Sequence, residues 1–334
     1  MRNSLRSLRE KIKIMKQKVI IWISVVLLLV VVAFMVKDFF YKPANLNSNP
    51  YDYRMDNLKK IDPSKVCYTE INKIKPDIEQ IHGIAIDKSD NIYIAGKGKV
   101  VIFDSQLALK SSFKIDNEAK CVGVGEDGNI YLGIQDHIEV FEPNGKLINS
   151  WNAVNSKSVI TSIAISEKYV YIADAGNRIV YQYKKDGDLV KEIGKKNPEK
   201  GILGFVIPSP YFDLLIGREG ELWVVNPGRH ALESYNENGD QVSSWAKASM
   251  GIDGFCGCCN PSNIAMLSDG SFVTSEKAIE RVKVHLPNGD FKCVVATPDG
   301  FEEGTKGIDL GVDSKDRIYV LDPIKNIVRV FEHK

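Results

Sequence analysis

The sequence has few of the residues and motifs on which catalytic sites are commonly built. It contains five histidines and six cysteines in 334 residues. No Gly-x-Ser-x-Gly segment is present, which argues against a serine nucleophile elbow. The glycine-rich turn at residues 125–128 is not followed by a helical pattern, so it is no phosphate-binding loop. Residues 87–91 lack the terminal glutamate of an EF-hand. The sequence therefore assigns no catalytic residue.

The chain also lacks a strong charge of either sign. Lysine and arginine number 44 and aspartate and glutamate 43, which gives a formal net charge of +1. A balanced charge gives no general reason to expect nucleic-acid binding, and we expect none.

One long uncharged segment stands out near the N-terminus. Residues 1–18 carry seven basic side chains and one acidic side chain, and Val19–Val36 then contains no charged residue. Eighteen such residues are about the length needed to cross a membrane, and the basic flank favours a cytoplasmic N-terminus. We therefore expect a basic cytoplasmic segment at 1–18 and a transmembrane anchor at 19–36. The alternative, a cleaved signal peptide, is disfavoured because no small-residue cleavage site follows.

This topology predicts a single-pass protein of the cell membrane with the rest of the chain outside the cytoplasm. Residues 37–63 contain prolines and asparagines without an apolar period, and we expect them to form a spacer.

A repeated pattern begins after the spacer. Short apolar alternations separated by Asp-Gly or Asn-Gly turns predict half-buried strands joined by hairpins. Six copies are present, and they begin at Ile84, Val122, Ile163, Leu214, Ile264 and Leu310. A period of about 40–50 residues is typical of propeller blades with four strands each. The sequence therefore predicts an all-β fold, a six-bladed propeller over residues 64–334.

The last copy is one strand short, whereas an extra strand-like segment, residues 66–74, precedes the first copy. We expect residues 66–74 to supply the missing outer strand, close the ring and cover the exposed sheet edge.

The copies resemble NHL repeats. The resemblance is clearest at Asn91–Ala95, at Tyr171–Ile179 and at Tyr319–Val330, and it extends over roughly residues 80–332. It implies a six-bladed NHL-type propeller and, by itself, no single function, because such propellers include protein-binding modules, RNA-binding modules and a few lyases. The lyases use several histidines around a channel zinc, and only His82 maps to the channel mouth here.

In such a propeller the connections into the inner strands reach the mouth of the central channel. Alignment of the copies places six residues at equivalent positions there: Gly83, Cys121, Ser162, Asp213, Asn263 and Asp309. With His82 beside them, Asp213, Asn263 and Asp309 are candidates to bind a ligand or a divalent cation. Polar residues that line a channel and cap strands are the ordinary explanation, and we favour it. Arg178 and Arg229, in equivalent blade loops, add positive charge to the same face.

Three of the six cysteines fall within Cys256–Cys259, in the connection that leads into the fifth copy. Thiols so close together indicate disulfides, redox chemistry or a metal or iron–sulfur site, with Cys121 as a further candidate. We favour disulfides, whose connectivity six cysteines leave open. Cys256, Cys258 and Cys259 are expected to face the channel mouth.

Together these patterns support a membrane-anchored binding or scaffold module. Its predicted site is the channel-mouth face of blades four to six, where a partner protein or a small ligand would bind. One alternative is a redox or metal-binding protein that uses Cys256, Cys258 and Cys259. A second alternative is a lyase or hydrolase that acts at a channel-bound cation.

Overall fold

The computed structural model describes residues 15, 18–19, 22–33 and 58–334. The chain divides into two units, Met1–Arg54 and Met55–Lys334. Residues 15, 18–19 and 22–33 are helical. Within the described residues, no helix combines the length and the apolar character that a membrane crossing needs. The expected anchor at 19–36 is therefore not shown, and its residues 20–21 and 34–36 lie outside the described part, as do most of the segments 1–18 and 37–63.

Residues 58–334, the described part of the second unit, contain 22 strands and four short 3-10 helices. The strands are β1 (Tyr68–Ile74), β2 (Ile81–Ile86), β3 (Ile92–Phe103), β4 (Leu109–Val124), β5 (Ile130–Ile134), β6 (His137–Phe141), β7 (Leu147–Trp151), β8 (Ile160–Ile165), β9 (Tyr169–Asp174), β10 (Ile179–Lys184), β11 (Leu189–Ile193), β12 (Leu214–Ile216), β13 (Leu222–Asn226), β14 (Ala231–Tyr235), β15 (Gln241–Ala246), β16 (Asn263–Met266), β17 (Phe272–Glu276), β18 (Arg281–His285), β19 (Phe291–Ala296), β20 (Leu310–Val312), β21 (Ile318–Asp322) and β22 (Ile327–His333). The 3-10 helices are η2 (Pro63–Lys65), η3 (Pro198–Lys200), η4 (Pro227–Arg229) and η5 (Pro298–Gly300).

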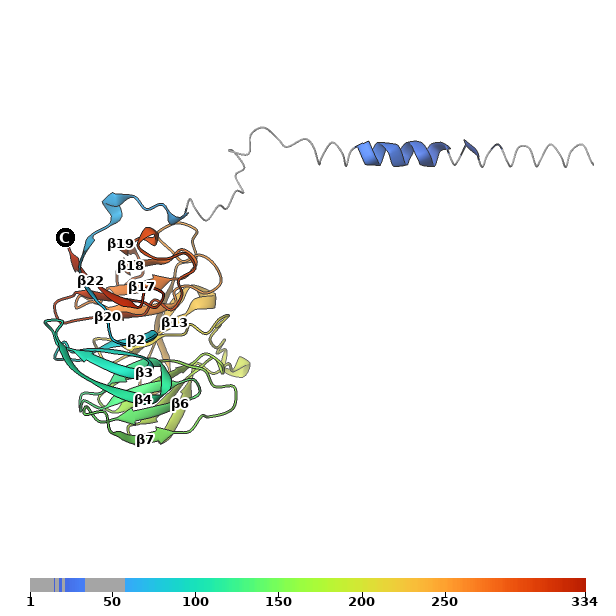
Figure 1. Ribbon diagram of the computed structural model, residues 1–334. Helices are drawn as coiled ribbons and strands as arrows, with labels where there is room; N and C mark the ends of the chain where they lie inside the picture. The colour runs from blue at the N-terminus through green and yellow to red at the C-terminus, as the bar shows by residue number, and fades with distance from the viewer. Residues whose placement is uncertain (1–14, 16–17, 20–21, 34–57) are drawn as a thin grey trace, which may run out of the picture. The chain divides into compact units, whose positions relative to one another are not determined.

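The strands form an all-β propeller of five antiparallel sheets, not the six separate blades that the sequence predicts. Four sheets have four strands, in the orders β1-β22-β21-β20, β11-β10-β9-β8, β12-β13-β14-β15 and β16-β17-β18-β19. The fifth has six strands in the order β2 to β7, and it holds the first two sequence copies (Figure 1). The two copies are joined because β4 is continuous over 16 residues. Its first half pairs with β3 and its second half pairs with β5.

The recurrent aromatic residue of the copies lies in the core. Tyr93, Tyr131, Tyr171, Trp223 and Tyr319 are all buried, and so is Val273, which takes this place in the fifth copy. The polar end of several of these rings donates to the acidic residue of the preceding turn. Tyr93 Oη lies 3.0 Å from Asp87, and Tyr319 Oη lies 3.1 Å from Asp313. The alternation of acidic turn and aromatic strand in the sequence thus has a packing reason, because a buried hydroxyl needs a partner.

The ring is closed by strands from opposite ends of the propeller. β1 pairs antiparallel with β22, from Tyr68 opposite His333 to Ile74 opposite Val328. Figure 1 shows the blue β1 segment against the red C-terminal strand. This is the partner expected for residues 66–74, although the strand itself begins at Tyr68. Arg329 on β22 also binds Glu70 on β1, with Nη2 to Oε2 at 2.6 Å.

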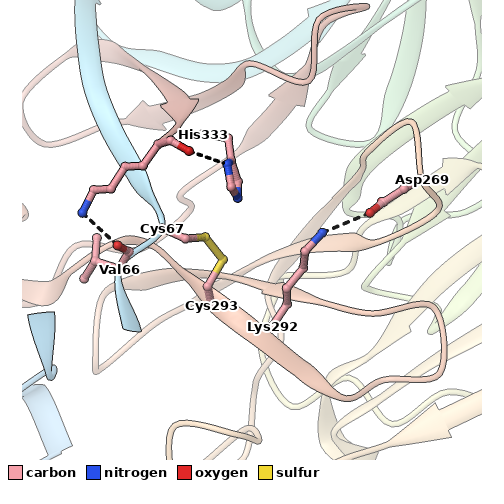
Figure 2. The surroundings of a disulfide bond; sticks show 7 residues. Val66, Cys67, Asp269, Lys292, Cys293 and His333 are labelled. Carbon is pink, nitrogen blue, oxygen red and sulfur yellow. Dashed lines mark hydrogen bonds and ion pairs between the residues drawn. A yellow bond between two sulfur atoms is a disulfide. The ribbon is translucent and has the colours of Figure 1, made fainter. Parts of the chain in front are cut away.

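A disulfide ties the closing strand to the neighbouring sheet as well. Cys67, just before β1, is bonded to Cys293 on β19, across a sequence separation of 226 residues (Figure 2). Backbone contacts accompany it, since Cys67 N donates to Val294 O at 3.2 Å and Lys334 N donates to Cys67 O at 2.9 Å. The segment before β1 is therefore held by the C-terminal end of β22 on one side and by β19 on the other.

Loss of the disulfide should destabilise the closed ring. We expect the double variant Cys67→Ser with Cys293→Ser to lose about 2–4 kcal/mol of unfolding free energy, because the bond constrains a long loop in the unfolded chain. Denaturant unfolding measures the effect. The matched control is reduction, which should destabilise the wild type and leave the double variant unchanged. Equal stabilities of both proteins under oxidising conditions would contradict this role.

Candidate functional site

The six ring positions found by aligning the sequence copies occupy equivalent places on the inner strands or immediately before them. Each pairs with the second strand of its copy in the same way: Gly83 with Ala95, Cys121 with Gly133, Ser162 with Ala173, Asn263 with Ser275, and Asp213 and Asp309 through their carbonyl oxygens with Val225 and Leu321. The inner strands approach each other closely here. A Cβ at Gly83 would lie 2.8 Å from the Cα of Cys121, so only glycine fits.

Polar side chains of the ring connect neighbouring copies. Asp213 Oδ2 accepts from the backbone N–H of Ile264 at 2.7 Å, and Asp309 Oδ2 accepts from that of Ile84 at 2.9 Å. Asn263 Nδ2 donates to Asp309 Oδ1 at 3.2 Å. The two carboxylates thereby pair with a backbone N–H of the next inner strand, that of Ile264 in β16 and that of Ile84 in β2. The favoured structural explanation for these residues is therefore supported by their contacts.

The two carboxyl groups of the ring share an unfavourable electrostatic environment. Burial raises the pKa of Asp213 to about 6. Burial, and then the charge of Asp213, raise the pKa of Asp309 to about 7. Near neutral pH the pair thus carries less than two full charges.

A cavity of about 400 Å³ opens above the ring, at the N-terminal ends of the inner strands. A second cavity of about 340 Å³ lies below it between the inner strands, and Thr161 and Asp309 border both. We call the first the mouth cavity. Its wall includes Ile160, Tyr211 and Phe212. Residues from all six sequence copies line it, and not only residues of the predicted blades four to six.

Charged groups of both signs surround the mouth cavity. Asp309 lies at its floor, and Lys120 and Lys306 contribute to its lining. Lys120 Nζ is 2.9 Å from Glu118, whereas Lys306 is exposed and has no ion-pair partner within residues 58–334. Lys306 therefore provides positive charge that a bound group can use.

His82 is part of this site, and the two predicted arginines are not. His82 lines the mouth cavity, and its Nε2 lies 2.5 Å from Glu118 Oε1. Burial outweighs that contact and lowers the pKa of His82. Arg178 instead borders a separate cavity with Glu192 and Lys195. Arg229 lies 3.8 Å from Glu233 in the same repeat.

The connection at residues 247–262, which carries three cysteines, is fastened to β17 and β18 by buried charges. Arg281 and Lys283 both contact Glu276, and all three side chains are almost fully buried. Lys283 Nζ also donates to Gly254 O at 2.6 Å and to Ile252 O at 3.1 Å. Burial lowers the pKa of Lys283 to about 8.

The three cysteines of this connection lie in two different surroundings. Cys256 is buried; burial, followed by the nearby charge of Glu276, raises its pKa. Cys258 is exposed and Cys259 is buried, with their Sγ atoms 3.0 Å apart. The contacts of the described residues do not support the three cysteines as a single metal site. None of the three lines the mouth cavity.

Cys259 lies beside groups that favour its thiolate. Burial opposes ionisation, but hydrogen bonds from Ser209, Cys258 and Lys277, with the charge of Lys277, outweigh it and lower the pKa of Cys259. Lys277 Nζ donates to Ser209 Oγ at 2.5 Å and lies 4.6 Å from the centre of the Tyr211 ring. Tyr211 also lines the mouth cavity. The Lys277 side chain therefore lies between the cysteine pair and the wall of that cavity.

The described residues do not fit the metal sites considered from the sequence. No group of three or more histidine, cysteine, aspartate or glutamate side chains in the described ranges converges as a metal site would require. Cys121 is separate from the other thiols, and burial, then the charge of Asp309, raise its pKa. The oxygens of Asp213 and Asp309 already accept N–H groups. We therefore derive no step through an iron–sulfur cluster or a channel cation.

Several residues of these sites were not singled out from the sequence. Ser209 and Lys277 come together from connections 68 residues apart, and Lys120 and Lys306 are ordinary surface lysines by local pattern. Asn260 is another: its side chain binds Cys256 O at 2.8 Å and Lys277 N at 3.0 Å, which fixes the cysteine connection to the β17–β18 turn. The polar Asn-Pro break before β16 was its only signal.

Comparison with known proteins supports the fold. A sequence profile described as "Beta-propeller repeat" matches residues 76–104. No curated protein sequence matches significantly. Among solved structures, a streptogramin B lyase superposes with a TM-score of 0.57 at 12% identity, covering 82% of this chain and 100% of that one. Virginiamycin B lyase from Staphylococcus aureus gives 0.54 at 13%, covering 80% and 99%. The WD40 propeller domain of Doa1 gives 0.51 at 13%, covering 76% and 79%. At these identities the similarity shows the propeller fold alone.

The carboxyl pair of the ring should make stability depend on pH. Both folded-state pKa values are raised, so their contribution to the unfolding free energy is complete below about pH 4 and is lost as pH rises through about 6–7. Asp309→Asn removes the repulsion between the two carboxylates. The unfolding free energy of this variant should therefore fall less between pH 4 and pH 8 than that of the wild type, by about 2–4 kcal/mol. Asp299→Asn, at an exposed site, is the matched control. Parallel pH profiles of the wild type and Asp309→Asn would contradict the assignment.

Proposed function

We propose that this protein is a binding module whose ligand enters the mouth cavity. The observation that carries the proposal is the cavity itself, about 400 Å³ in volume, open to solvent and lined by every sequence copy. Its size falls in the range of small-molecule and peptide sites, about 300–1,000 Å³. Apolar walls with a few convergent polar groups are typical of such sites.

The lining indicates the chemistry of the ligand. Tyr211 offers apolar contact area, and Lys306 attracts an anion. A short acidic peptide, or a small molecule that carries a carboxylate on an apolar body, matches these two features. The carboxylate would meet Lys306, and the apolar body would lie against Tyr211.

The proposal is tested with tripeptides that share their apolar residues and differ only in one side chain, which is acidic, neutral or basic. Acidic peptides should raise the melting temperature and bind by calorimetry. Lys306→Glu should weaken them by about tenfold because it reverses the attracting charge. Tyr211→Ala should weaken every peptide that binds, because it removes apolar contact.

The matched control is Lys315→Glu, which makes the same charge change at the exposed turn after β20. It should leave binding unchanged. If Lys306→Glu and Lys315→Glu weaken peptide binding equally, the effect comes from the net charge of the protein, and the role of Lys306 in the mouth cavity is contradicted. Absence of binding by every peptide class would overturn the proposal.

We further propose that the propeller is of the six-bladed NHL type. The strand register supports this count. β3 pairs with β2 through residues 92–96 and with β4 mainly through residues 99–103. β4 then pairs with β5 through residues 119–124. The six-stranded sheet thus contains two units that share β4.

We also propose that the propeller is displayed outside the cytoplasm on a membrane anchor. Two observations support this location. The uncharged run at 19–36 has the length of a membrane span and follows a basic segment. The Cys67–Cys293 disulfide belongs to an oxidising compartment, where such bonds persist.

Protease added to intact bacterial spheroplasts that express the full-length protein should digest residues 64–334, because the propeller would be exposed. The control is a cytoplasmic protein in the same cells, which should be digested only after lysis. Protection of the propeller until lysis would contradict the proposed location.

A further inference from the structure

Cys258 and Cys259 are adjacent thiols with unequal access to solvent. Their Sγ atoms are 3.0 Å apart, both are free, and Cys258 is exposed whereas Cys259 is buried. On the buried side, Ser209 and Lys277 are hydrogen-bonding neighbours of the Cys259 sulfur. These neighbours come from two other connections of the propeller, so the pair has a built environment and is not a chance exposure of sulfur.

We propose that Cys258 and Cys259 form a dithiol–disulfide couple that oxidises accessible dithiols. In the oxidised state the two sulfurs are bonded to each other. A thiolate of the dithiol attacks Cys258 Sγ, the Cys258–Cys259 bond breaks, and Cys259 leaves as a thiolate. The mixed disulfide joins the first sulfur of the dithiol to Cys258. The second sulfur of the dithiol, as a thiolate, then attacks that first sulfur, the bond to Cys258 breaks, and Cys258 leaves as a thiolate. Two electrons pass to the cysteine pair, the dithiol becomes a disulfide, and its two protons pass to Cys258, Cys259 or water. Exchange with another disulfide regenerates the couple.

The unequal surroundings of the two sulfurs fix their roles. The attacking group must reach the exposed sulfur, which is Cys258. Exchange is faster when the departing thiolate is the more stable one, and Lys277 and Ser209 stabilise that of Cys259. The two steps thus use the sulfurs in the order that the structure favours.

Chain geometry makes the oxidised pair a good oxidant. Neighbouring Cα atoms are about 3.8 Å apart, whereas disulfides normally span about 4.4–6.8 Å. A bond between adjacent cysteines is therefore strained, and strained disulfides have more oxidising potentials.

Cys256 has the Cys-x-x-Cys spacing to Cys259 but lies in other surroundings. It is buried beside Glu276, Arg281 and Lys283, and burial and the Glu276 charge hold its pKa above the usual range. A thiol of this kind is a poor nucleophile. This assignment is independent of the proposed ligand in the mouth cavity, because it needs no residue that binds that ligand.

The test titrates the full-length protein in mixtures of oxidised and reduced dithiothreitol, traps thiols with iodoacetamide and weighs the tryptic peptide 248–277. One two-electron transition is expected, with one cysteine alkylated in the oxidised state and three in the reduced state. Cys256→Ser should retain the transition, and Cys258→Ser or Cys259→Ser should abolish it, with folding checked by melting. A pair that stays reduced throughout, or a transition that disappears in Cys256→Ser, would overturn the proposal.

Lys277 is the positioning residue of the couple, and its variants test the leaving group. Lys277→Gln should slow the reduction of the oxidised pair by dithiothreitol by at least about threefold, because a more basic thiolate leaves more slowly. The same change should shift the equilibrium toward the disulfide. Lys277→Arg should preserve both values. An unchanged rate in Lys277→Gln would overturn the assignment of Cys259 as the leaving group.

Discussion

The propeller depends on one constraint: strands from opposite ends of its sequence must meet to close the ring. β1 and β22 are separated by more than 250 residues, so their pairing is entropically costly until the intervening sheets are in place. Once formed, the contact covers two sheet edges that would otherwise be open to other chains. The Cys67–Cys293 bond adds a covalent link at the same place. The same closed ring brings the first and last inner strands together, where Asp309, which lines the mouth cavity, binds Ile84.

Closure also determines what the inner ring can contain. Side chains converge on the axis, so a ring position must be small or must bind a neighbouring strand. Gly83 takes the first solution, and Ser162, Asp213 and Asp309 take the second. The cost is two carboxyl groups in one poorly solvated channel, which raises the pKa of both. The same groups that join the copies therefore make the closed ring sensitive to pH.

Much of the architecture is predictable from the sequence because strand alternation and turn residues report local geometry directly. The repeat spacing predicts a propeller, and the missing last strand predicts the partner of β1. The number of separate sheets is not predictable in this way. Whether β4 breaks between Phe113 and Ala119 depends on continuous pairing with β3 and β5, which no local pattern records.

The site was predictable only where its residues repeat. Alignment of the copies found Asp213, Asn263 and Asp309, but nothing in the copies marks Ser209 or Lys277. In β18, Arg281, Lys283 and His285 alternate with valines, a pattern typical of a strand with one face in water. All three are buried because the connection at 247–262 covers that face and its carbonyls bind Lys283. Cys256 and Cys259 have Cys-x-x-Cys spacing, yet Cys256 lies beside Glu276 whereas Cys259 lies beside Ser209 and Lys277.

Lys277 is where the two candidate sites of this protein meet. It contacts Ser209, lies over the Tyr211 ring, and is a hydrogen-bonding neighbour of Cys259. Oxidation of Cys259 would remove the thiolate that attracts the Lys277 ammonium group. The remaining contacts of this group would then be those with Ser209 and Tyr211. Tyr211 forms part of the mouth-cavity wall. Energetic coupling between two sites is reciprocal, so any factor by which oxidation changes the affinity for the ligand is also the factor by which the ligand changes the dithiol–disulfide equilibrium. Two functions proposed on separate observations would then form one linked equilibrium, transmitted by a single side chain.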